Sequence, residues 1–105
     1  MELQRIAKVI RSKNAGPCLV TFDLIFGSMK DFLVARDHLP FLKQEVARRY
    51  GRTLEEISII DFEPALAVKI TIPRDVVSGD PGDRDVYGAQ QHAPLLDIAW
   101  PEKAR

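Results

Sequence analysis

The stretch Ala65-Leu66-Ala67-Val68-Lys69-Ile70-Thr71-Ile72 alternates between branched apolar side chains and small or polar ones. Successive side chains of a β-strand point to opposite faces of a sheet. The alternation therefore predicts a strand with one face in the core and the other toward a wetter surface. The predicted inward set is Leu66, Val68, Ile70 and Ile72. Pro73 has no backbone N–H to donate, so it is expected to end the strand.

Alternation of the same kind predicts further strands on both sides of this one. Residues 19–26 form the first, with Thr21 and Asp23 on the wetter face. Its predicted inward set is Val20, Phe22, Leu24 and Phe26. Residues 57–62 and 95–100 are the two other predicted strands.

The middle of the chain is predicted to be helical. Ser28 begins one helix, because its hydroxyl can accept a free backbone N–H of the first turn. Pro40 ends that helix and is tolerated in the first turn of the next one. Gly51 is expected to close the second helix in the left-handed conformation.

Residues 3–12 are consistent with two structures. Apolar side chains recur there at helical spacing, which favours a helix, while a short strand is the alternative. Residues 12–17 predict a turn, because Gly16 and Pro17 punctuate the chain.

Strands at both ends of a helical middle predict an α+β fold over residues 1–105, as a single domain. We expect a mainly antiparallel sheet of four to five strands with two helices packed on one face. Residues 73–94 form a long loop, and residues 101–105 a frayed tail. Solvent or a second subunit would cover the other face of the sheet, which carries Thr21, Asp23, Lys69, Thr71 and Asp97.

The bulk composition excludes several classes of protein. Its 15 basic and 15 acidic residues give a net charge of +0, so no overall field favours nucleic acid. No segment is long and apolar enough to act as a signal peptide or to span a membrane. The single cysteine, Cys18, excludes an internal disulfide and is expected in the core. We therefore expect a cytoplasmic protein that binds neither nucleic acid nor membrane.

A cluster of cationic and polar residues precedes the first predicted strand. Its sequence is Arg11-Ser12-Lys13-Asn14-Ala15-Gly16. Arginine can hold a carboxylate or phosphate with two hydrogen bonds, lysine adds a point charge, and a glycine-containing turn can free backbone amides. This segment predicts an anion site formed by Arg11, Ser12, Lys13, Asn14 and Gly16, although an ordinary basic turn has the same composition.

A second candidate segment is the long loop Ser78–Leu96, where glycines at positions 79, 82 and 88 lie among polar side chains. Loops of this length inside a small domain are usually functional or disordered. His92 is the candidate catalytic base, and its alternative role is to tie the loop to the fold. The further candidate ligand-binding residues of this loop are Asp83, Asp85, Tyr87, Gln90 and Gln91.

No metal site is predicted. Asp80, Asp83 and Asp85 could hold a hard cation, but their spacing does not match a calcium-binding EF-hand loop, and turns stabilised by aspartate explain them as well. The sequence identifies no cofactor.

Residues 10–17 (Ile-Arg-Ser-Lys-Asn-Ala-Gly-Pro), Pro73-Arg74 and residues 78–96 together resemble a small bacterial family. It is a domain of unknown function whose members often occur beside AtuA-like (acyclic terpene utilisation) proteins. The likeness covers nearly the whole chain, with Cys18 where an aromatic residue is expected. The first segment is also similar, more distantly, to a turn in the C-terminal ferredoxin-like domain of AtuA-like proteins. That likeness implies a ferredoxin-like fold, a strand over residues 4–10, and a turn over residues 11–16.

The resemblance implies no established activity. It implies an accessory or site-completing subunit that acts with a larger AtuA-like protein in carboxylic-acid or acyl-CoA catabolism, and that binds an anion through the turn at residues 11–16 and the loop at residues 78–92. The chain is expected to form a homo-oligomer. Two alternatives remain open: a self-sufficient lyase or isomerase of small carboxylic acids with His92 as base, and a non-catalytic oligomerisation module.

Overall fold

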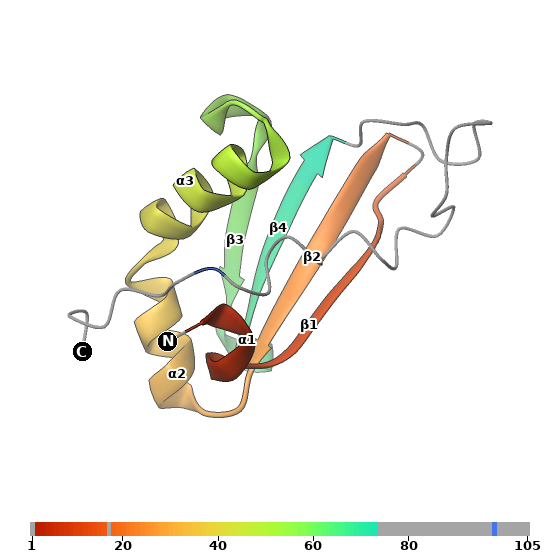
Figure 1. Ribbon diagram of the computed structural model, residues 1–105. Helices are drawn as coiled ribbons and strands as arrows, with labels where there is room; N and C mark the ends of the chain where they lie inside the picture. Colours follow the sequence, from red (N-terminus) through yellow and green to blue (C-terminus); the bar gives the residue numbers. More distant parts are fainter. Residues whose placement is uncertain (1, 17, 74–97, 99–105) are drawn as a thin grey trace.

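The computed structural model of the chain describes residues 2–16, 18–73 and 98 (Figure 1). Its elements follow the order α1 (Leu3–Ile6), β1 (Ala7–Asn14), β2 (Leu19–Phe26), α2 (Met29–Arg36), α3 (Leu39–Tyr50), η1 (Leu54–Glu56), β3 (Ser58–Phe62), η2 (Glu63–Ala65) and β4 (Ala67–Pro73). Within these residues, no helix is long and apolar enough to cross a membrane.

The four strands form one sheet in the order β1-β2-β4-β3, and each neighbouring pair is antiparallel. Helices α2 and α3 lie together on one side of this sheet (Figure 1). The predicted α+β class is therefore confirmed, and the arrangement is compatible with a ferredoxin-like fold. The predicted strands over residues 19–26 and 57–62 correspond to β2 and β3.

The core lies between the sheet and the helices. The inward residues predicted for β2, from Val20 to Phe26, are all at most 2% exposed. Phe32 of α2 and Leu42 of α3 meet them from the helix side and are fully buried. The inward set of β4 is confirmed for Val68, Ile70 and Ile72. Leu66 is different: it closes η2 in the left-handed conformation, with φ of 51°, so the strand begins at Ala67, two residues later than predicted.

The helix ends follow the capping signals of the sequence. Ser28 Oγ accepts the backbone N–H of Asp31 at 3.2 Å, which fixes the start of α2. Gly51 ends α3 with φ of 64°, where a side chain would be strained. The tilted ring of Tyr50, at the end of α3, packs 5.1 Å from that of Phe22.

The N-terminal segment combines both predicted structures. Leu3 begins a single helical turn, is fully buried, and donates its N–H to the carbonyl of Ile98 at 2.8 Å. The prediction of a helix through residue 12 is wrong, because β1 begins at Ala7 and pairs with β2. The strand implied by the resemblance is wrong for its first three residues, which belong to α1.

Strand β1 also extends further than predicted. It continues through Asn14, so the prediction of a turn over residues 11–16 is wrong for its first four residues. Cross-strand pairing up to Asn14 with Val20 outweighs the turn preference of the polar residues. Cys18, expected in the core, is exposed just before β2.

One irregularity interrupts the pairing of β1 with β2. Ala7 pairs with Phe26 and Val9 pairs with Ile25, so Lys8 is an extra residue, as in a β-bulge. Ala7 is buried, whereas Val9 is 38% exposed. Odd-numbered residues therefore face the core before Lys8, and even-numbered residues face it afterwards.

Candidate functional site

A row of paired side chains crosses the face of the sheet that the helices leave open. Arg11 of β1 pairs with Asp23 of β2, and Asp23 pairs with Lys69 of β4. Lys69 in turn pairs with Ile60 of β3. Directly paired residues in antiparallel strands have neighbouring side chains. The register therefore brings residues 11, 23, 60 and 69 into one line across four strands.

Two further rows flank this charged row. On one side lies a row rich in hydroxyl groups, in which Thr21 Oγ1 and Thr71 Oγ1 are hydrogen-bonded at 3.3 Å. The members of this row are Lys13, Thr21, Thr71 and Ser58. On the other side lies an apolar row. Its members are Val9, Ile25, Ala67 and Phe62. The open face thus changes from hydroxyl to charged to apolar along the strands.

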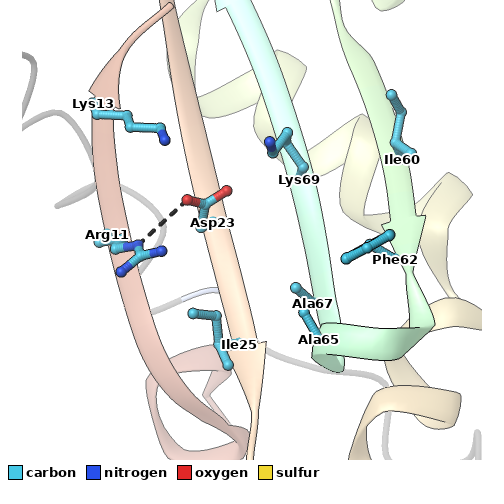
Figure 2. A pocket seen from close by; sticks show the side chains of 9 residues that line it. All are labelled: Arg11, Lys13, Asp23, Ile25, Ile60, Phe62, Ala65, Ala67 and Lys69. Carbon is cyan, nitrogen blue, oxygen red and sulfur yellow. Dashed lines mark hydrogen bonds and ion pairs between the residues drawn. The ribbon is translucent and has the colours of Figure 1, made fainter.

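A hollow of about 420 Å³ lies over the charged and apolar rows (Figure 2). It is lined by Arg11, Lys13, Asp23, Ile25, Ile60, Phe62, Ala65, Ala67 and Lys69. Figure 2 shows the amino ends of Lys13 and Lys69 directed toward strand β2 from its two sides.

The charges of the hollow do not cancel. Arg11 Nε lies 3.3 Å from Asp23 Oδ2, and the aspartate side chain is only 10% exposed whereas the arginine side chain is 61% exposed. Within the described part of the chain, Lys13 and Lys69 have no ion-pair partner. Three cations and one carboxylate line the hollow, so two positive charges are in excess (3 − 1 = 2). The arrangement is suited to holding an anion.

The structure separates the residues predicted in the cationic segment. Arg11 and Lys13 both line the hollow. Ser12 lies between them on the strand, is 6% exposed, and faces the helix side of the sheet. Asn14 ends β1, and Gly16 lies beyond it with φ of 100°. Only two of the five predicted side chains or backbone groups therefore belong to the hollow.

The candidate residues of the long loop lie outside the described residues. These are Asp83, Asp85, Tyr87, Gln90, Gln91 and His92. Their proposed roles in ligand binding and proton transfer remain predictions.

The site also contains residues that the sequence patterns do not identify as binding residues. Asp23 and Lys69 were predicted on the open face, but only the strand register places them beside Arg11. Ile60 and Phe62 are 57% and 56% exposed, although they are large and apolar. Period-two alternation in residues 57–62 could have assigned both to one face. It could not have placed that face beside Lys69, because the alternation within one strand does not specify the order of the strands in the sheet.

The sequence model of one family, described as "Domain of unknown function (DUF4387)", matches residues 3–99. No curated protein and no solved structure is significantly similar to this chain.

Proposed function

Because this chain belongs to the DUF4387 family, whose description names no activity, we propose its function from the open face of the sheet: it binds an organic carboxylate there. The observation that carries this proposal is the excess of two positive charges around the hollow. Lys13 and Lys69 supply them, since Arg11 is paired with Asp23.

The pairing of Arg11 with Asp23 supports the proposal in a second way. The aspartate holds the guanidinium through Nε, so the terminal N–H groups of Arg11 keep donors for a ligand. A ligand carboxylate between Lys13 and Lys69 would pair with the two cations that Asp23 leaves uncompensated. Charge-assisted hydrogen bonds of this kind are about twice as strong as neutral ones.

The wider role that we propose is that of an accessory subunit in the cytoplasm. The resemblance of residues 10–17 and 78–96 to a family found beside AtuA-like proteins favours a larger AtuA-like partner, in carboxylic-acid or acyl-CoA catabolism. An open binding face also favours this role, because a partner docked over the hollow would enclose its ligand.

Titration with butanoate, followed by the backbone amide shifts of the full chain, tests the binding proposal. We expect saturable shifts around residues 11–13 and 67–69. Lys69→Gln and Lys13→Gln should each weaken binding by about tenfold, the cost of one charge-assisted hydrogen bond. Lys30→Gln is the matched control, because Lys30 is an exposed lysine of α2 on the helix side.

Added salt should weaken the same binding, because the cations are accessible to solvent. If butanoate caused no saturable shifts, or if Lys30→Gln weakened binding as much as Lys69→Gln, the proposal would be refuted. Folding of each variant is checked by far-ultraviolet circular dichroism.

The accessory role has its own test. Co-expression with an AtuA-like protein encoded beside it should yield a complex that survives size-exclusion chromatography. If the two proteins elute separately, and the larger one is fully active alone, the accessory role is wrong while carboxylate binding can still stand.

A second candidate function is assembly of a homo-oligomer through the open face. The exposed side chains of Ile60 and Phe62 favour it, because large apolar groups exposed together often mark interfaces. Sedimentation velocity of the wild-type chain and of Phe62→Ser distinguishes this candidate: an oligomer that becomes a monomer on substitution supports it, and a monomer in both cases refutes it.

A further inference from the structure

We infer that the hollow selects monocarboxylates that carry an apolar body, and that it binds them in one orientation. This inference rests on the proposed carboxylate site and specifies its ligand. The carboxylate lies between Lys13 and Lys69, and the apolar body lies over Ile25 and Phe62.

The first argument is the segregation of the lining. All four charged residues of the hollow come from the charged row and from Lys13 beyond it. The apolar members lie on the opposite side or at the edge formed by β3. They are Ile25, Ile60, Phe62, Ala65 and Ala67. A ligand that matches both parts must itself have a charged end and an apolar end.

The second argument is the cost of placing the ligand in any other way. The side chains of the apolar row offer no hydrogen-bond donor, so a second carboxylate there would lose its hydration without gaining a partner. Dicarboxylates and strongly hydrated anions are therefore disfavoured. In contrast, an apolar body covers the exposed surface of Phe62, which is favourable in water.

The third argument is the shape of the apolar end. Ala65 and Ala67 are small and lie between the larger side chains of Ile25 and Phe62 (Figure 2). They leave a low floor on which a hydrocarbon chain can rest against the sheet. The hollow, at about 420 Å³, lies near the lower end of the range for ligand pockets, roughly 300–1,000 Å³. This size fits a small acid rather than a dinucleotide.

A homologous series of ligands tests the inference on the full chain. Dissociation constants are measured by NMR titration for acetate, butanoate and hexanoate. We expect affinity to rise by about twofold per methylene. This corresponds to about half of the free energy gained when a methylene is buried completely, because the hollow is open on one side. Over the four methylenes from acetate to hexanoate the gain is about sixteenfold. Butanoate should also bind more tightly than butanedioate, which has the same number of carbon atoms.

Two kinds of variant should act on different parts of this series. Phe62→Ala should reduce the gain per methylene, so that it weakens hexanoate binding more than acetate binding, and Ile60→Ala provides a second apolar variant. Lys69→Gln should weaken all three acids by the same factor and leave the gain per methylene unchanged. Transferred nuclear Overhauser effects should link the terminal methyl group of hexanoate, rather than its α-methylene, to the ring of Phe62.

The failures of the inference and of the proposed function are distinguishable. Equal affinity for all three acids, with Lys69→Gln still effective, overturns the inference and leaves carboxylate binding intact. If 1-hexanol binds as tightly as hexanoate, or if none of the acids binds, the carboxylate site itself is refuted. Contacts of Phe62 with the α-methylene alone overturn the proposed orientation.

Discussion

The two faces of the sheet come from the same strands, and residues one position apart in the sequence point to opposite faces. On the helix side, Phe22 and Leu24 are fully buried, and Tyr50 and Phe32 pack in the same layer. On the open side, Asp23 contacts a solvent-exposed arginine, and Phe62 is 56% exposed. The comparison indicates that the helix side stabilises the fold, while the open side is available for binding.

Substitution of Phe22 provides the largest expected difference between the faces. Phe22→Ala removes a fully buried ring that packs on Tyr50, and should lower the free energy of unfolding by about 3–5 kcal/mol. Phe62→Ala makes the same chemical change on the open face and should cost less than about 1 kcal/mol. Urea denaturation measures both. Equal losses would mean that the open face is also part of the structural core.

Asp23 tests whether an open-face residue can affect stability and binding in opposite directions. Asp23→Asn removes the ion pair with Arg11 and should lower the free energy of unfolding by about 1 kcal/mol, because the arginine is largely solvated. The same change leaves three cations without a carboxylate in the hollow, so butanoate should bind more tightly.

Thermal unfolding and butanoate titration of Asp23→Asn are measured on the same sample. A variant that loses stability and also loses binding would show that Asp23 orients Arg11 for the ligand. In that case, the position of the Arg11 guanidinium matters more for ligand binding than the negative charge of Asp23.

Alkaline pH should act on the helix side through Tyr50. Burial raises the pKa of the Tyr50 phenol above its ordinary value of 10.0. The folded state therefore holds this proton more tightly, and the resulting stability is complete below pH 10 and is lost as the pH rises toward the raised pKa. Between pH 10 and 11 the loss should be less than about 1 kcal/mol, because the ring is partly exposed.

Tyr50→Phe isolates this contribution. The difference in melting temperature between pH 9 and pH 11 should be smaller in the variant than in the wild-type chain. An unchanged difference would assign the alkaline loss to other groups.

The smallest expected effect concerns the hydroxyl row. Thr71→Val removes the hydrogen bond to Thr21 but keeps the shape and the strand preference of the residue. The free energy of unfolding should fall by about 0.5 kcal/mol, the low end for a hydrogen bond between neutral groups, because the 3.3 Å separation is long. Chemical denaturation checks this value, and a loss above 2 kcal/mol would show that the hydroxyl pair is part of the stabilising face after all.

The sequence alone was sufficient for most of the fold. Period-two alternation of apolar side chains identified the inward residues of β2 and, apart from Leu66, those of β4, because these side chains form the core. Capping residues such as Ser28 and Gly51 marked helix ends through local hydrogen bonds and backbone conformation. Residues 3–12 could not be assigned from the sequence. One helical turn followed by a strand fits neither the helical period nor the strand period over the whole segment.

The candidate site was only partly predictable. The chemistry of Arg11 and Lys13 predicts their place in the site, but Ser12 would join them only in a turn, and the segment is a strand. In a strand, neighbouring residues point to opposite faces, so Ser12 faces the helix side while Arg11 and Lys13 face the open side. Lys69 and Phe62 joined the site through strand order and register, which depend on contacts between distant segments.

The extra residue Lys8 in β1 determines which side of the sheet receives the cations. Before it, Ala7 faces the helices, and after it the odd-numbered residues face the other way. Without this shift of phase, the strand anchored at Ala7 would turn Arg11 and Lys13 into the hydrocarbon interior and expose Ile10 to water. One inserted residue thus lets Leu3 and Ala7 stay buried in the core while the rest of β1 supplies charge to the opposite surface.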